Sequence, residues 1–484
     1  MIINNLINTF NNFLWSYVLI ILLIGLGLYF SFKTKFVQIR YIKEMFRLLG
    51  DGLGKNSDKS NHSISSFQAF CISTASRVGT GNLAGIAIAI SVGGAGAVFW
   101  MWLIALIGAA SSFIESTLAQ IYKEKTKIGF RGGPAYYMEK ALKKRWMGVT
   151  FSILITISFG LVFNSVQSNT ISLAFDEAFN FPTLWMGIIL SVLTAFIIFG
   201  GIKRIAKISE IIVPVLATLY IAIALFIMIK NIGQIPSVIK LIFQQAFGIK
   251  EFVGGTLGGT ILIGVKRGLF SNEAGMGSAP NAAATAEVSH PVKQGLIQTL
   301  GVFTDTLIIC SCTAFIILLS NVNIDGSLTG IQLTQKALSS EIGSFGSIFI
   351  AICVFLFAFS SIVGNYYYGQ SNIEFLSDKK TPLFIYRILV VGMVLFGSIT
   401  KVDLVWTLAD LFMGLMALLN LFAITLLSKY SIIALKDYAS QKKAGILEPV
   451  FDSSKFEEFK ELKLWRRDYK DTEEYDEYLE ENAL

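Results

Sequence analysis

Long apolar runs, separated by short polar loops, fill the chain from its first residues to about position 430. A helix crosses a hydrocarbon layer of about 30 Å with roughly 20 mainly apolar residues, because it satisfies its backbone hydrogen bonds internally. Eleven segments fit this description, some of them interrupted: residues 15–32, 67–90, 97–121, 147–174, 184–200, 208–229, 252–288, 295–319, 342–368, 383–399 and 404–427. The pattern predicts an all-α integral membrane protein with about eleven transmembrane helices.

Composition and charge support this class. Of the 484 residues, 54% are hydrophobic and 15% are charged, and the mean hydropathy is +0.62. Lys and Arg are retained on the cytoplasmic side of membranes, and they concentrate in alternate loops once residues 33–59 are placed inside. We therefore expect the amino terminus outside the cell membrane and the carboxyl terminus in the cytoplasm. This anchoring explains the net charge of +7 without nucleic acid, and the first span, which has no signal-peptide features, is expected to stay as an anchor.

Glycine and polar residues interrupt two of the apolar segments, at residues 73–85 and 264–277. Each interrupted segment opens a half that contains four further spans. Because five is an odd number, the second half must cross the membrane in the opposite sense, which predicts an inverted repeat with two broken helices. The predicted divisions are a leading helix with its loop, two repeats and a cytoplasmic tail, at residues 1–66, 67–230, 251–428 and 429–484.

Broken helices suit an amino acid as ligand. Helix amino termini offer N–H groups and partial positive charge to a carboxylate, while helix carboxyl ends offer carbonyls to an ammonium group or a sodium ion. Close helix packing through Gly81 and Gly85 is the alternative explanation of the first interruption. Arg77, Arg267 and Glu273 favour a functional site, because ionisable groups in spans are costly.

The run GGAGAVFWMWLIALIG at residues 93–108 resembles the signature of the alanine or glycine:cation symporter family, of the sodium:alanine symporter type. The resemblance extends from residue 15 to residue 427. It implies sodium-coupled, or sometimes proton-coupled, uptake of alanine, glycine or related amino acids on a leucine-transporter-type five-plus-five fold.

The resemblance also implies roles for residues of the first break, since residues 78–82 are similar to the unwound segment of that wider fold. The backbone N–H groups of Thr80 and Gly81 would receive the substrate carboxylate. The carbonyls of Ala75 and Val78 would face a sodium ion.

Hydroxyls of Ser360 and Ser361, in the eighth core span, would complete the oxygen shell of that ion. A hydrogen bond from each hydroxyl to the preceding helical turn is the alternative. Asn82 is a candidate ligand of a second ion.

Further candidates would line the substrate pocket. Asn164 and Gln167 lie three residues apart on one helical face, where an interhelical hydrogen bond is the alternative. Ser271, Asn272 and Met276 come from the second break, whose Glu273 would cap the half-helix or pair with Arg77.

Asn365 precedes the run Tyr366-Tyr367-Tyr368-Gly369, where many relatives carry Trp. An amide in place of a large ring adds space, a donor and an acceptor. We therefore prefer glutamine to alanine as substrate, unless Asn365 faces a neighbouring helix.

Glu115 and Asp305 are acidic residues in apolar spans. Such residues could relay protons. We expect them instead to form structural salt bridges with Arg77, Lys266 or Arg267.

The chain shows no HExxH motif, Ser/His pair or carboxylate cluster at a membrane face, so we do not expect an enzyme. Its cysteines have no CxxC spacing and its histidines no metal-ligand pattern, so we expect no cofactor besides the coupling ion. The partners are a small neutral amino acid, sodium or a proton, and the lipid bilayer, with no nucleic acid or obligate protein partner. The predicted function is symport of alanine, glycine or glutamine with sodium; the alternatives are proton-coupled symport and a passive channel.

Overall fold

A computed structural model describes residues 9–54, 64–126, 129–248, 256–324, 328 and 330–466. These residues are almost entirely helical, which confirms the predicted all-α class. The one sheet among them is a short hairpin of β1 (Glu124–Thr126) and β2 (Gly129–Arg131). The acidic run at residues 471–481, the loop with His62 and the start of the predicted span 252–288 lie outside the described residues.

The leading helix and the first half follow the predicted order. The leading helix consists of η1 (Leu14–Leu19) and α2 (Ile20–Lys33), followed by α3 (Val37–Arg40) and α4 (Ile42–Gly54). The first half contains a broken helix of α5 (Ser66–Arg77), η2 (Gly81–Gly85) and α6 (Ile86–Gly93), then α7 (Gly96–Ile121), α8 (Pro134–Lys140), α9 (Arg145–Ile155), η3 (Thr156–Phe163), α10 (Asn164–Phe179), α11 (Thr183–Ile198) and α12 (Gly201–Lys230).

The second half repeats this succession after a connector of η4 (Ile232–Gln234) and α13 (Ile235–Ala246). Its broken helix consists of α14 (Leu257–Asn272) and the short α15 (Ala279–Ala283). The other elements are α16 (Pro291–Val302), η5 (Phe303–Cys310), α17 (Ser311–Leu319), α18 (Gly330–Ile342), α19 (Phe345–Leu376), α20 (Lys380–Ile399) and α21 (Val402–Lys443).

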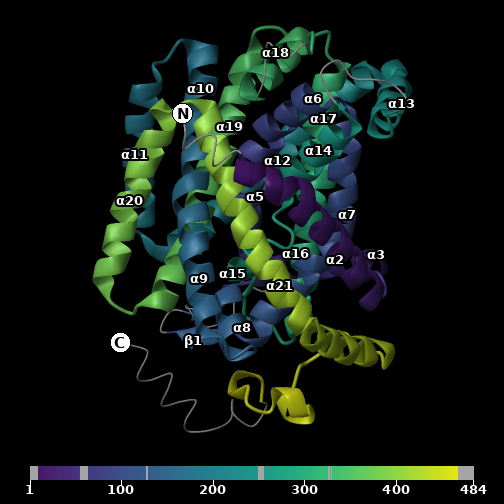
Figure 1. The fold of residues 1–484 in the computed structure, drawn as a ribbon, viewed down its shortest axis with the longest axis vertical. Helices are drawn as coiled ribbons and strands as arrows, with labels where there is room; N and C mark the ends of the chain where they lie inside the picture. The colour runs from purple at the N-terminus through teal and green to yellow at the C-terminus, as the bar shows by residue number, and fades with distance from the viewer. Residues whose placement is uncertain are drawn as a thin grey trace.

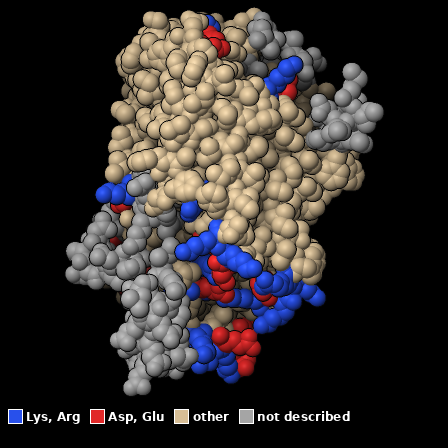
Figure 2. Space-filling model, turned by 90° about the vertical axis from the view of Figure 1, so that its left-hand side faces the viewer, with Lys and Arg blue, Asp and Glu red and all other residues tan. Residues whose placement is uncertain are grey.

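Eight helices in the described part of the chain are long and apolar enough to cross a membrane: 9–33, 96–121, 145–179, 209–230, 291–319, 345–376, 380–399 and 402–443. The predicted count of about eleven is not confirmed, because the two broken segments and α11 fall short of that length. Large exposed apolar side chains such as Phe196 and Val192 face outward. Figure 2 shows a broad uncharged surface, with charged residues gathered toward the lower end.

Helix packing places the breaks at the centre. Helix α7 packs against both α14 and α16, and α10 packs against α19 and α20, which also contacts α11. These two groups lie on opposite sides of the molecule in Figure 1. Local signals set the start of α5, where Ser65 and Gln68 form a reciprocal capping box.

The end of the chain folds back on the molecule. Helix α21 continues to Lys443, and η6 (Ser453–Lys455), η7 (Glu457–Phe459) and η8 (Lys463–Trp465) follow. The indole N–H of Trp465 donates to the carbonyl of Ile121 at the end of α7, at 3.2 Å. This segment lies at the lower end of Figure 1.

Candidate functional site

The first break is a short interruption between α5 and η2. Val78 has extended backbone angles, φ −80° and ψ 92°, and the helix resumes at Thr80. The Gly79 N–H donates to Asn82 Oδ1 at 2.9 Å, and the Thr80 N–H donates to Gln167 Oε1 at 3.0 Å. Both backbone N–H groups of the break are therefore bound by side chains. The Thr80 N–H, which was predicted to bind the substrate carboxylate, is hydrogen-bonded to Gln167 in this structure.

The second break is wider and rests on a buried carboxylate. Helix α14 ends at Asn272, and Gly275 and Gly277 have φ of 84° and 85°, which glycine adopts without strain. Their N–H groups each donate to Glu115 of α7 at 3.0 Å. Asn420 of α21 donates to the same carboxylate at 2.8 Å. Glu115 thus holds the break in shape, a role that its position in the sequence does not reveal.

Oxygen atoms converge between the first break and α19. Ser361 Oγ lies 2.8 Å from the carbonyl oxygen of Ala75, 3.3 Å from that of Val78 and 3.1 Å from that of Phe357. Ser360 Oγ donates to the Phe357 carbonyl at 2.8 Å. The structure therefore brings Ala75, Val78 and Ser361 into contact, while Ser360 shares only the Phe357 carbonyl with Ser361. Both hydroxyls also form the bond to the preceding turn. The sequence analysis did not identify the Phe357 carbonyl, because every residue has a backbone carbonyl and no side-chain pattern marks this one.

A second group of polar side chains surrounds Asp305 of η5. Its carboxylate accepts from Asn82 Nδ2 at 2.6 Å, Ser271 Oγ at 2.7 Å and Thr306 Oγ1 at 2.9 Å. The group is fully buried and joins the two breaks to η5. Ser271 therefore lies in this cluster, and Thr306 is a member that the sequence analysis missed.

The predicted salt bridges of the buried carboxylates were wrong within the described part of the chain. Glu115 and Asp305 bind amides and hydroxyls, while Lys266 and Arg267 both pair with Asp410 of α21. Glu273 pairs with no cation there either. It accepts from Ser76 at 2.8 Å and Ser278 at 2.5 Å.

Arg77 donates instead to the Gln298 carbonyl and side-chain oxygens, each at 3.3 Å.

The remaining predicted pocket residues differ in their surroundings. Asn164 Nδ2 donates to the Gly160 carbonyl one turn earlier, so the alternative of an interhelical bond does not hold for Asn164 among the described residues, whereas Gln167 forms one with Thr80. Asn272 Oδ1 accepts from the Ala274 N–H and caps the break. Met276 is fully buried beside the second break.

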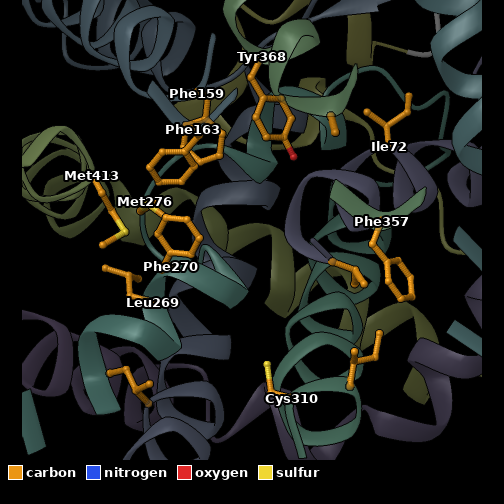
Figure 3. Packing of buried hydrophobic residues seen from close by; sticks show 14 of the residues in the cluster. Ile72, Phe159, Phe163, Leu269, Phe270, Met276, Cys310, Phe357, Tyr368 and Met413 are labelled. Atoms are coloured by element: carbon orange, nitrogen blue, oxygen red, sulfur yellow. The ribbon is translucent and has the colours of Figure 1, made fainter. Parts of the chain in front are cut away.

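Asn365 of α19 accepts from Ser76 Oγ at 2.6 Å, and its Nδ2 has no partner among the described residues. The same holds for the hydroxyl of Tyr368, one turn further along the same face. In Figure 3 this hydroxyl points between the Phe159–Phe163 pair and Ile72. Asn365 thus belongs to the central region and contacts the first broken helix.

Aromatic rings cover the first break. The ring centroid of Phe270 lies 4.7 Å from that of Phe163 and 4.7 Å from that of Trp406. A Cβ on Gly81 would lie 3.1 Å from the Phe270 ring. Phe163 and Phe270 face each other in Figure 3.

Two broken helices at matching places in two halves, with buried polar groups between them, are typical of a membrane transporter. Comparisons with known proteins agree. The model of the sodium:alanine symporter family matches residues 1–453. The chain belongs to this family, and it is a cation-coupled amino-acid symporter, not an enzyme.

Individual relatives cover nearly the whole chain. A Bacillus subtilis (strain 168) protein named as a probable sodium/glutamine symporter, GlnT, is 58% identical over 96% of both chains. The amino-acid carrier protein AlsT of the same organism is 57% identical over 96% of this chain and 97% of its own. The crystal structure of MhsT with L-phenylalanine has a TM-score of 0.54 at 16% identity, covering 78% of this chain and 99% of that one. This last likeness confirms the predicted fold.

Proposed function

We propose that the protein takes up glutamine together with sodium by alternating access. The observation that carries the sodium assignment is the convergence of the Ala75, Val78 and Phe357 carbonyls on the Ser361 hydroxyl, with the Ser360 hydroxyl bonded to the same Phe357 carbonyl. Sodium, like other hard cations, prefers oxygen ligands. These five oxygens join the first broken helix to α19, so that bound sodium would hold the two together.

A second cation would bind at Asp305. Its carboxylate and the hydroxyls of Ser271 and Thr306 offer hard oxygen ligands. Asn82 now turns its Nδ2 toward this carboxylate and its Oδ1 toward the Gly79 N–H, so its amide would have to rotate to ligate the ion. Proton coupling is the competing possibility, since a buried carboxylate without a cationic partner among the described residues is also a proton carrier.

Glutamine is supported by the amide at position 365. Asn365 does face a neighbouring helix through its Oδ1, which accepts from Ser76 of α5, but its Nδ2 and the Tyr368 hydroxyl have no partner among the described residues and lie on one face of α19. Both are available to a side-chain amide of the substrate. The relative named as a probable sodium/glutamine symporter also supports this preference.

Uptake into proteoliposomes tests the proposal. Radiolabelled glutamine should accumulate against its gradient when sodium is outside, and replacement of sodium by potassium should abolish accumulation. Accumulation driven equally well by a pH gradient without sodium would favour proton coupling. Equilibration without accumulation would favour a channel.

Competition with alanine, glycine, serine and asparagine tests the substrate. Asn365→Trp should reduce glutamine uptake more strongly than alanine uptake, because the ring fills space and removes the amide. Equal loss of both, or indifference of the wild type to glutamine, would contradict the assignment.

A further inference from the structure

An ion cluster joins α14 to α21 on the side of the two breaks where the leading helix begins. We call this the amino-terminal side. Asp410 Oδ2 lies 2.8 Å from Lys266 Nζ, and Asp410 Oδ1 lies 2.5 Å from Arg267 Nη2. Asp410 and Arg267 are 6% and 3% exposed. Buried charges are costly to separate from their partners, so the cluster resists parting of the two helices.

This cluster lies against the aromatic cover of the first break. The Arg267 guanidinium is 4.6 Å from the Trp406 ring and 5.7 Å from the Phe270 ring. Phe270 in turn packs over Gly81. A substrate that reached the first break from this side would have to pass while the cluster and the rings were parted.

The leading helix forms hydrogen bonds to the same part of α21. Trp15 is 1% exposed, and its indole N–H donates to the Asp410 carbonyl at 3.1 Å. One turn earlier, Asn11 Nδ2 donates to the Thr407 carbonyl at 3.1 Å. Lys266 Nζ lies 5.5 Å from the centroid of the Trp15 ring. Trp15 therefore touches both α21 and a cationic partner of Asp410.

Close packing of leucine side chains from the leading helix against the backbone of α21 adds to these hydrogen bonds. A Cβ on Gly414 would lie 2.6 Å from a methyl carbon of Leu14 and 3.1 Å from one of Leu19. The leading helix thus fits α21 on both sides of the turn that carries Asp410.

We propose that Trp15 is a positioning residue of an outer gate, which holds Asp410 against Lys266 and Arg267. The leading helix thereby sets how readily α14 and α21 separate. The proposal rests on alternating access as proposed above. Loss of the indole hydrogen bond shifts the conformational equilibrium toward the state open on the amino-terminal side.

Accessibility of a native cysteine measures this equilibrium. Cys310 is buried, and its sulfur lies 3.1 Å from the hydroxyl of Ser271, the residue after Phe270. The other three cysteines are replaced by alanine, at positions 71, 312 and 353. In this background, Trp15→Phe should raise the rate of Cys310 labelling by a membrane-impermeant maleimide, applied from the amino-terminal side, at least threefold. Asn11→Ala should act in the same direction, and Cys310→Ala provides the blank.

Two controls separate positioning from general damage. Tyr17→Phe, on the exposed face of the same helix, should leave labelling unchanged. Trp15→Phe should lower the maximal uptake rate two- to fivefold without raising KM, because occlusion is slowed while external binding is not.

A double-variant test decides whether Trp15 acts through Asp410. In an Asp410→Asn background, Trp15→Phe should add no further labelling. Equal labelling of wild type and Trp15→Phe, or an undiminished effect in the Asp410→Asn background, would overturn the proposal. Labelling needs no transport, so a failure of the glutamine and sodium assignments would show separately, in the uptake assay.

Discussion

Ser360 and Ser361 are neighbours on α19, yet their hydroxyls have different surroundings. The Ser361 hydroxyl reaches the carbonyls of Ala75 and Val78 across the helix interface, while the Ser360 hydroxyl donates to the Phe357 carbonyl in its own helix. Of the two, Ser361 is therefore the direct link between α19 and the first break.

We predict that Ser361→Ala raises the sodium concentration for half-maximal uptake about tenfold. A hydrogen bond or ligand contact to a charged group contributes on the order of 1.5–3 kcal/mol, and about 1.4 kcal/mol corresponds to tenfold in affinity. Ser360→Ala should have a smaller effect, and the double variant the largest. Sodium titration of uptake, normalised to protein in the membrane, measures this. Unchanged sodium dependence in the double variant would remove both serines from the proposed site.

A side chain at Gly81 would crowd its neighbours, whereas Gly85, one turn on, has room for a Cβ. A Cβ at Gly81 would lie 3.1 Å from the Phe270 ring and 3.2 Å from the Ser271 backbone, but one at Gly85 would lie 3.7 Å from the Trp406 ring. We predict that Gly81→Val abolishes substrate binding while Gly85→Ala keeps it. Substrate-dependent thermal stabilisation in detergent measures binding, and a stabilised Gly81→Val protein would indicate that Gly81 serves helix packing alone.

At the scale of elements, the second break depends on a carboxylate from another helix. The loop from Glu273 to Ser278 turns its Gly275 and Gly277 N–H groups toward Glu115, and Asn420 completes the contact. Buried backbone donors need acceptors, so Glu115 joins α7, α21 and the break into one unit.

We predict that Glu115→Gln destabilises the protein by about 1–3 kcal/mol, because the amide replaces one acceptor oxygen by a donor that faces Asn420 or a backbone N–H. The melting temperature in detergent should fall by several degrees. Ser116→Ala is the matched control, since its buried hydroxyl has no partner among the described residues. A Glu115→Gln protein as stable as that control would contradict the role of Glu115.

At the scale of the whole molecule, the segment after α21 packs against α4 and the start of α16. The Phe451 N–H donates to the Ser289 carbonyl at 2.9 Å. Glu448 pairs with Arg47 of α4 at 2.9 Å and with Lys293 of α16. Burial alone would raise the pKa of Glu448, but hydrogen bonds and charges from Lys293 and Arg47 outweigh it and lower this pKa from 4.5 to about 2.

The sign of the pH dependence follows. A carboxyl with a lowered pKa in the bound state contributes stability above pH 4.5 and loses it as the pH falls toward 2. We predict that hydrogen exchange in the segment around Phe451, corrected for intrinsic rates, increases between pH 5 and pH 2. Glu448→Gln should remove most of this increase, and substitution of the exposed Glu458 by Gln should not. An equal increase in all three proteins would assign the release to other groups.

The features that could be predicted from the sequence are those that depend on residues close together in the chain. The membrane helices follow from apolar runs, and the breaks at residues 73–85 and 264–277 follow from glycine and polar residues inside such runs. The structure places the breaks there, around Val78 and between Glu273 and Ser278. The structure brings Ala75, Val78 and Ser361 into contact, and their role as sodium ligands stays a prediction that rests on family resemblance. The orientation in the membrane stays a prediction.

The sequence by itself determined the class of protein, the helices and the position of the two breaks, because hydropathy and glycine act within a few residues. Only the tertiary structure decided the partners of the buried charges. Glu115 and Asn420 are 305 positions apart, and Arg267 and Asp410 are 143 apart. A carboxylate in an apolar span must find donors, but which donors it finds depends on how the helices cross. Asp305 therefore binds the amide of Asn82 and the hydroxyl of Ser271, while Asp410 binds the cations.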